Sequence, residues 1–262
     1  MTTSIIRQRD TGASSRFIVV LFFMSFSLLP AYASASVSLG QPNVTALSSG
    51  LVGYWPLDGA TTNWTTGITR DVSGQGNNGS LVSMSTTTSP SVGKVGQSLK
   101  FIESTSAVSI TNGFANTISG NNNHTVSMWF KAATISPYPV LLGSSGQYYY
   151  QLGGVTSNRT FYVQVGATYR TYTLSMPLST GTWYHMTFVK NGAGDVGDLY
   201  INDIKQTSWT GSIASMPATG TDLKIGQYVS AGYGFTGSID DVRVYSRALS
   251  AIEIEELYLL GL

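Results

Sequence analysis

The sequence predicts an all-β protein in which two antiparallel sheets pack as a sandwich, with one short helix near the C-terminus. Charged residues make up only 10% of the 262 residues, whereas Gly occurs 29 times and Tyr 15 times. Such a composition is typical of many strands joined by tight turns. Short β-rich segments follow one another between turn signals without alternating helices. The length suits one large β domain.

Each predicted strand combines β-branched or aromatic residues with turn residues at its ends. The clearest is 125–131, in which Val126, Met128 and Phe130 fall on one face. Asn202 and Asp203 both tolerate left-handed backbone conformations, so they predict a two-residue hairpin turn. The predicted strands are 51–57, 98–101, 107–110, 125–131, 140–143, 148–152, 161–165, 169–174, 183–190, 198–201, 204–207, 223–226 and 235–244.

One helix is predicted close to the C-terminus. Ser250 and Glu253 have the spacing of a capping box, in which each residue satisfies a backbone amide of the other. Ile254, Leu257 and Tyr258 then fall on one face. We expect this helix to pack across the edge of the sandwich.

The first 35 residues have the order of a secretory signal peptide: basic residues, an apolar stretch, and small residues after Pro30. The apolar stretch 17–29 is shorter than the roughly 20 residues that span a bilayer. We therefore expect residues 1–35 to be cleaved and the protein to be secreted, extracellular or at the cell surface, without membrane insertion after cleavage. An uncleaved N-terminal anchor is the alternative. Residues 36–50 read as a linker, and 51–262 as one domain.

Charge and cysteine content exclude several partners. Removing residues 1–35 takes away three of the 14 basic and one of the 13 acidic residues, which leaves a net charge of −1. A near-neutral domain without a basic run argues against nucleic acid and against anionic membrane surfaces. Because the chain has 0 Cys, it contains neither disulfides nor thiolate metal sites.

Seven segments, in order along the chain, resemble the motifs of laminin G-like jelly-roll domains. They are GLVGYWPLDG at 50–59, DVSGQGNNG at 71–79, GKVGQSLKF at 93–101, TVSMWFK at 125–131, WYHMTFV at 183–189, LYIN at 199–202 and FTGSIDDVRVYSRALS at 235–250. The resemblance covers 51–262 and implies a two-sheet jelly-roll sandwich of the concanavalin A-like class. That fold hosts lectins, glycosidases, adhesion modules and spacers, so it does not by itself decide the function.

Catalysis is not expected. Glycosidases of the concanavalin A-like class place two glutamates and an aspartate on one strand face, because the reaction needs paired carboxylates. The chain has four glutamates, of which three lie in the predicted helix and Glu103 stands alone. His124 and His185 are far apart in the sequence and no serine or metal motif accompanies them, so we interpret them as structural.

The family resemblance implies a structural Ca²⁺ near Asp58 and the adjacent Asp240 and Asp241. Hard cations prefer oxygen ligands, which loops of such sandwiches supply. Neighbouring strand residues point to opposite faces, so we expect at most one of the adjacent pair to ligate by its side chain. The alternative is that these carboxylates pair with Arg243, Arg247 or a backbone amide. No other cofactor is expected.

Ligand binding should depend on aromatic side chains, because sugar faces stack on Tyr and Trp. The candidates lie in polar segments and are Tyr148, Tyr149, Tyr150, Tyr169, Tyr172, Tyr228, Tyr233 and Trp209. For each tyrosine the alternative is an ordinary half-buried strand position. The sequence thus predicts a secreted, non-catalytic binding module for carbohydrate recognition or adhesion, with a glycan or a cell-surface protein as its partner. The alternatives are a structural cell-surface protein that contacts other proteins and, more remotely, a glycan-active enzyme.

Overall fold

The computed structural model describes a domain within one compact unit, Gly40–Leu262. The described residues are 44–102, 105–111, 114, 123–135, 139–144, 148–154, 157–165, 168–192, 197–208, 222–228 and 233–262. The predicted signal peptide lies outside them. No helix among these residues combines the length and the apolar character needed to cross a bilayer.

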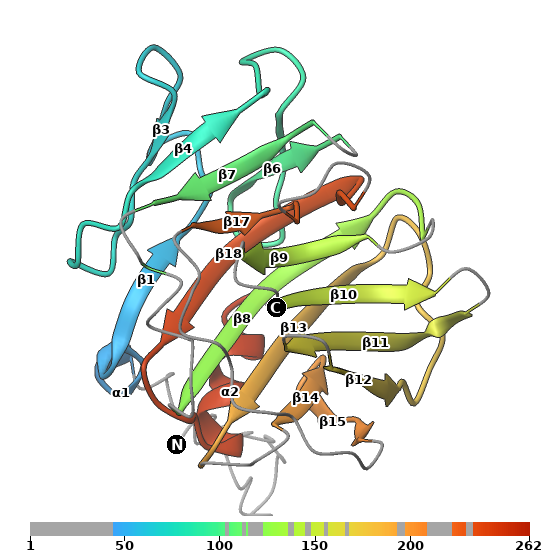
Figure 1. Ribbon diagram of the computed structural model, residues 1–262. Helices are drawn as coiled ribbons and strands as arrows, with labels where there is room; N and C mark the ends of the chain where they lie inside the picture. The colour runs from blue at the N-terminus through green and yellow to red at the C-terminus, as the bar shows by residue number, and fades with distance from the viewer. Residues whose placement is uncertain are drawn as a thin grey trace, which may run out of the picture. The chain divides into compact units, whose positions relative to one another are not determined.

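Two antiparallel sheets form the domain, which confirms the predicted fold class (Figure 1). The eight-stranded sheet has the order β15-β14-β13-β8-β18-β6-β5, with β1 also paired to β18. Its strands are β1 (Leu51–Trp55), β5 (Pro90–Val92), β6 (Gln97–Phe101), β8 (His124–Ala132), β13 (Trp183–Lys190), β14 (Asp198–Ile201), β15 (Ile204–Lys205) and β18 (Gly237–Tyr245).

The ten-stranded sheet has the order β16-β12-β11-β10-β9-β17-β7-β4-β3-β2. Its strands are β2 (Thr62–Asn63), β3 (Ile68–Thr69), β4 (Gly79–Val82), β7 (Ala107–Ile110), β9 (Val140–Ser144), β10 (Tyr148–Gly154), β11 (Ser157–Val165), β12 (Thr168–Thr173), β16 (Thr207–Ser208) and β17 (Leu223–Ile225). Both sheets pair strands that are distant in sequence, as β1 with β18 shows in the eight-stranded sheet and β17 with β9 in the ten-stranded sheet.

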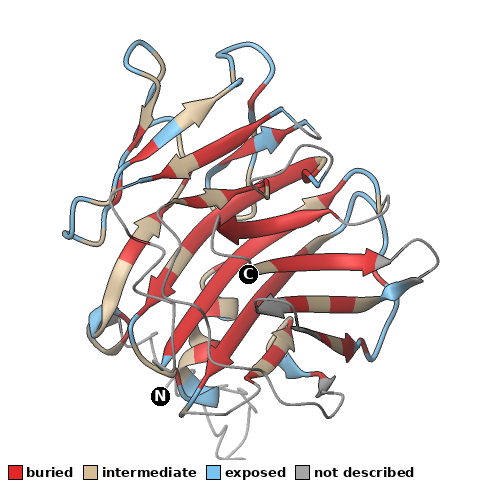
Figure 2. Cartoon of the chain, in the orientation of Figure 1, coloured by how far each residue is buried: buried red, intermediate tan, exposed pale blue. Residues whose placement is uncertain are grey.

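The core lies between the inner faces of the two sheets. In β8, Val126, Met128 and Phe130 belong to it, as their alternation predicts. Opposite them in β13, Met186 and Phe188 are fully buried in the same cluster. Burying an aliphatic or aromatic side chain of this size contributes about 1.5–3 kcal/mol. Figure 2 shows the buried residues concentrated in the central strands.

Two helices lie outside the sheets. Helix α2 (Ala251–Leu259) begins at Ser250, and its capping box with Glu253 is present, as predicted. Tyr258 of α2 stacks on Trp129 of β8, with ring centroids 5.5 Å apart. Trp129 is on the side of β8 opposite the core residues, so the helix covers the outer face of the eight-stranded sheet. The prediction that it crosses the edge of the sandwich was wrong.

The segment assigned to a linker, 36–50, is ordered in its last part. Residues 44–48 form the short helix α1 (Val44–Ser48), and Leu47 is buried in a small cluster with Ile254 and Leu257 of α2. The guanidinium of Arg247 anchors this segment by donating hydrogen bonds to the carbonyl oxygens of Ala46 and Ser49, at 3.0 and 2.7 Å.

Candidate functional site

The tyrosines of the ten-stranded sheet separate into inward and outward sets. Tyr150 and Tyr172 are fully buried, and their rings lie edge-on to Phe188 at 5.2 and 6.4 Å between centroids. The Tyr172 hydroxyl donates to the carbonyl of Gly197 at 3.0 Å. These two residues were wrongly included among the ligand-binding candidates, because strand alternation turns their side chains into the core.

Tyr149 is on the other face of β10. Its ring meets that of Tyr228 at 5.1 Å between centroids, in an edge-to-face arrangement. Tyr228 in turn meets Tyr233 edge-to-face at 6.4 Å. Tyr149 and Tyr228 are half-buried and Tyr233 is 42% exposed. Three of the predicted candidates therefore form one cluster on the outer face of the ten-stranded sheet, which we call the tyrosine cluster.

A glycine allows this cluster to form. The neighbour of Tyr149 on β9 is Gly143, where a Cβ atom would lie 3.0 Å from the Gln227 carbonyl oxygen and 3.2 Å from Tyr228. The backbone of Tyr228 can approach the sheet closely because this position has no side chain. The connection is fixed by a hydrogen bond from the Tyr228 amide to the Tyr233 carbonyl at 3.1 Å.

Polar side chains continue the outer face beside the cluster. Lys224 of β17 pairs with Gly143 on one side and with Ser109 of β7 on the other, and Ser109 pairs with Ser80 of β4. Leu223 and Ile225, the neighbours of Lys224 along the strand, are fully buried, so Lys224 points outward. The sequence analysis did not identify Lys224 or Gly143, although the Leu-Lys-Ile alternation predicts an outward lysine.

The remaining tyrosine candidates and Trp209 are not placed by the structure. Tyr148 and Tyr169 lie in strands β10 and β12, but their side chains are outside the described residues. Trp209 lies outside them altogether. They stay predictions.

Two of the predicted calcium ligands clamp the turn between β5 and β6. Asp240 of β18 accepts hydrogen bonds from the amides of Lys94 and Val95 at 2.7 and 2.9 Å. Asp58 accepts from the amide of Gln97 at 2.6 Å. Gly96 has a positive φ of 65°, and a Cβ atom there would lie 2.9 Å from the Asp58 carboxylate, so the clamp requires glycine.

Burial raises the pKa of Asp240 to about 7, against the effect of its two amide donors and with smaller contributions from Asp241 and Asp58. The Oδ1 atom of Asp240 is buried and has no hydrogen-bond partner within the described part of the chain. A hard cation would satisfy such an oxygen, so Asp58 and Asp240 fit the predicted calcium site in their chemistry.

Asp241 does not belong to this pair. Its φ of 51° marks a β-bulge, where the β8–β18 register shifts, and its carboxylate accepts from Arg243 at 3.1 Å. Across the residues that the structure describes, no three His, Asp or Glu side chains converge on one point. The adjacent Asp240 and Asp241 therefore have separate partners, backbone amides for Asp240 and Arg243 for Asp241, and these are the partners that the alternative to a calcium site predicted.

A serine and a histidine lie within hydrogen-bond distance, but under helix α2. Ser127 Oγ and His185 Nε2 are 2.8 Å apart, and both residues are at most 2% exposed. Nδ1 of His185 is buried without a partner in the described structure, so no acid orients the ring. Burial, and then the charge of Arg243, lowers the pKa of His185 to about 3. These observations support the interpretation of His185 as structural.

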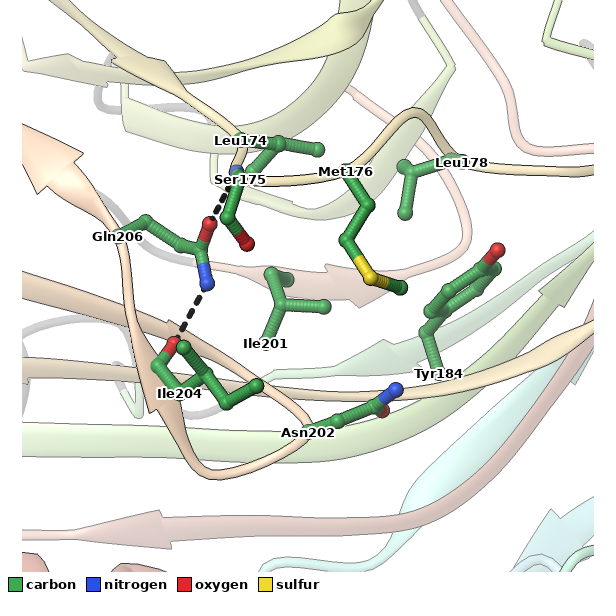
Figure 3. A pocket seen from close by; sticks show the side chains of 9 residues that line it. All are labelled: Leu174, Ser175, Met176, Leu178, Tyr184, Ile201, Asn202, Ile204 and Gln206. Carbon is green, nitrogen blue, oxygen red and sulfur yellow. Dashed lines mark hydrogen bonds between the residues drawn. The ribbon is translucent and has the colours of Figure 1, made fainter.

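A small apolar pocket lies at the hairpin that joins β14 and β15 (Figure 3). Its walls include Leu174, Met176 and Ile201, and its volume is about 20 Å³, the space of roughly one water molecule. Gln206 bridges its rim by accepting from the Ser175 amide and donating to the Ile204 carbonyl, at 2.8 and 2.6 Å. The pocket is too small for a sugar ring.

A model of the laminin G family, described as the concanavalin A-like lectin/glucanases superfamily, matches residues 103–255, which is more than half of the chain. The chain belongs to this family. The predicted resemblance is confirmed, and the matched region contains the whole tyrosine cluster and Lys224. No curated protein sequence matches the chain significantly.

Solved structures share the fold at low sequence identity. Domain 4 of AbnA, an extracellular GH43 arabinanase from Geobacillus stearothermophilus solved with arabinotriose, matches with a TM-score of 0.62 and 18% identity, over 80% of this chain and 98% of that one. A structure of botulinum neurotoxin type C, a toxin whose cell entry depends on two ganglioside molecules, matches with a TM-score of 0.60 and 12% identity. The match covers 84% of this chain and 53% of the toxin chain. A Trypanosoma rangeli sialidase matches with a TM-score of 0.56 and 16% identity, over 88% and 35%. The last two chains are thus covered only in part.

Proposed function

We propose that the protein is an exported, non-catalytic carbohydrate-binding module, and that the tyrosine cluster on the outer face of the ten-stranded sheet contacts the glycan. Its concanavalin A-like lectin fold agrees with this proposal, as do the arabinotriose and ganglioside ligands of the similar structures. Export is inferred from residues 1–35 alone.

The observation that carries the proposal is the arrangement of Tyr149, Tyr228 and Tyr233. Three rings on one face are held in edge-to-face contact, and Gly143 lets Tyr228 approach the sheet closely. Aromatic faces stack on the C–H surfaces of sugar rings, while the phenol hydroxyls remain available for hydrogen bonds. Hydroxyl groups of Ser80 and Ser109 lie farther along the same face and suit further sugar units.

The proposal that the module is non-catalytic rests on where its carboxylates lie. The strands of the ten-stranded sheet contain neither Asp nor Glu. In the other sheet, Asp240 and Asp241 are engaged by backbone amides and by Arg243. Glycoside hydrolysis by paired carboxylates needs two such groups about 5–10 Å apart on either side of a sugar, and the strands of the sheet that carries the tyrosine cluster supply none.

We propose further that Asp58 and Asp240 hold a structural Ca²⁺ that fixes the turn between β5 and β6. Adding Ca²⁺ to the protein in place of EDTA is then expected to raise the melting temperature, and Asp240→Asn is expected to abolish the rise. Equal melting temperatures of the wild-type protein in Ca²⁺ and in EDTA would exclude a structural calcium at this turn.

A glycan array with the purified full-length chain tests the binding proposal. We expect binding to at least one class of glycan, and an approximately tenfold or greater loss of affinity in Tyr228→Ala. Tyr200→Ala is the matched control, because Tyr200 is a half-buried tyrosine of the eight-stranded sheet. The proposal fails if no glycan binds, or if the two variants lose affinity equally.

A further inference from the structure

We propose that the glycan recognised at the tyrosine cluster is anionic, and that Lys224 binds its carboxylate or sulfate group. The inference rests on the proposed function of the cluster and adds the chemical class of the ligand. It depends on the position of Lys224, on the absence of an ion pair to it among the described residues, and on the surroundings of the other two basic residues of the sheet.

The strand register places Lys224 next to the cluster. Lys224 pairs with Gly143, and Gly143 pairs with Tyr149, so the three residues form a row across β17, β9 and β10. Neighbouring strands are about 4.8 Å apart, so Lys224 is about one strand spacing from Gly143 and two from Tyr149. Tyr228 lies over the glycine in the middle of this row. A sugar ring on Tyr228 therefore has an ammonium group at its side, within the reach of a lysine side chain.

No carboxylate in the described structure forms an ion pair with this ammonium group. Its strand and the nine others of the sheet contain no acidic residue. Asp222, two residues before Lys224 in the sequence, is the closest acid along the chain. The ion pairs of the described residues join Lys205 to Asp198, Arg243 to Asp241 and Arg247 to Glu253, and none involves Lys224.

The other two basic residues of the sheet have different surroundings. The guanidinium of Arg159 donates to the carbonyl oxygens of Leu174 and Ser175, at 3.4 and 3.2 Å, next to the small apolar pocket. Arg170 is 3% exposed. Arg159 is exposed, but it shares the strand face of the core residues Phe161 and Val163 of β11. Lys224 is therefore the basic side chain that the described part of the outer face presents to a ligand.

A cation at the rim of an aromatic site selects between ligands of equal shape. A charge-assisted hydrogen bond to a carboxylate or sulfate is about twice as strong as a neutral one. At a half-exposed position the gain is screened by salt, so we expect a difference of about tenfold between a charged sugar and its neutral counterpart.

Pairs of glycans that differ only in charge test the inference. The full-length chain is titrated calorimetrically with oligogalacturonate and its methyl ester, with sialyllactose and its methyl ester, and with a sulfated galactan and its unsulfated form. We expect an acidic member to bind about tenfold more tightly than its neutral partner, with the difference shrinking as NaCl rises from about 0.05 to about 0.5 M. The acidic member that binds identifies whether the carboxylate or the sulfate is preferred.

Lys224→Gln is expected to remove this preference, with a loss of affinity for the acidic member about tenfold larger than any loss for the neutral member. Lys100→Gln is the control, because it changes the net charge equally but alters an exposed residue of β6, in the other sheet. If neutral glycans bind in a Tyr228-dependent manner and acidic ones bind no better, the inference fails while the proposed function holds. If only neutral glycans of the array bind and none of these acidic members does, the inference fails and the proposed function holds; if nothing on the array binds either, both fail. An equal effect of the two lysine variants would also overturn the inference.

Discussion

The two outer faces of the sandwich differ in what covers them and in their charge. On the eight-stranded sheet, helix α2 lies over Trp129, which is 1% exposed, and over the hydrogen-bonded Ser127 and His185. On the ten-stranded sheet, the tyrosine cluster is partly exposed and Lys224 stands beside it. Aspartates occur in the strands of the first sheet and in none of the second.

The comparison shows that similar residue types serve different purposes in one fold. An aromatic side chain on the outer face of the eight-stranded sheet stabilises the domain because helix α2 buries it. An aromatic side chain of the tyrosine cluster is held in place by its neighbours and remains accessible to a ligand. Substitutions on the first face should therefore change the free energy of unfolding. Those on the second should change binding.

The largest effect on stability is expected for Trp129→Ala. Trp129 stacks on Tyr258 and lies 4.9 Å from the ring of His185, so the substitution leaves a large cavity under α2. We expect a loss of about 3–5 kcal/mol in the free energy of unfolding, measured by urea denaturation. Tyr228→Ala should lose less than about 1 kcal/mol in the same experiment. Similar losses in the two variants would contradict the distinction between the faces.

Gly143→Val is expected to disrupt the tyrosine cluster, because the new side chain would lie between strand β9 and Tyr228. Its side chain would collide with Tyr228 and the Gln227 carbonyl, which lie 3.2 and 3.0 Å from a Cβ atom at this position. We expect a moderate loss of stability, about 1–3 kcal/mol, together with loss of glycan binding in calorimetry. Retained affinity in a folded Gly143→Val protein would show that the cluster is not the binding site.

Two buried titratable groups on the helix-covered face are expected to act on stability in opposite directions. The pKa of His185 falls to about 3 in the folded state because of its burial and the charge of Arg243, so the stability that neutral His185 preserves is lost as the pH falls from about 6.5 towards 3. Burial raises the pKa of Asp240 to about 7, so its contribution is greatest below about pH 4 and is lost as the pH rises through 7.

Denaturation in EDTA between pH 4 and 7 separates the two effects. Asp240→Asn should make stability rise more steeply with pH, and His185→Gln should make it rise less steeply or fall. Each group contributes a slope of at most about 1.4 kcal/mol per pH unit. Unchanged slopes in both variants would mean that neither group differs in pKa between the folded and unfolded states.

The smallest effect is expected for Glu253→Gln. The Glu253 carboxylate accepts from Arg247 at 2.6 Å and from the Ser250 amide at 2.8 Å, and the hydrogen bond with Arg247 is the main cause that lowers its pKa to about 2. The substitution should cost about 1 kcal/mol at neutral pH, since Gln can keep the capping bond but not the ion pair. The difference from wild type should vanish as the pH falls from 4.5 through 2, and a difference that persists at pH 2 would argue against the ion pair.

Sequence patterns predicted most of the strands because their alternation and turn residues are local. The turn at Asn202 and Asp203, with φ of 51° and 62°, and the capping box of α2 were predicted for the same reason. Strands β2 to β5 were not predicted. They are two to four residues long, and β5 begins with a proline, so too few positions alternate to be recognised.

The site was harder to predict because it depends on pairing between distant segments. Tyr149 and Tyr228 lie in different strands and connections, and their contact requires Gly143, which no local pattern distinguishes from other glycines. Along a run such as Tyr148–Tyr150, successive side chains of a strand point to opposite faces of the sheet. Three consecutive tyrosines show no polar–apolar alternation, so the sequence does not indicate which of them face the core. The bulge at Asp241 likewise exists only in the paired sheet.

A crystal structure of the protein with an oligosaccharide chosen from the array tests the central claim most directly. We predict a sugar ring stacked on the tyrosine cluster, with Tyr228 beneath it and an anionic group of the glycan within hydrogen-bond distance of Lys224. A glycan bound instead at the turn clamped by Asp58 and Asp240, or on the face covered by α2, would contradict it.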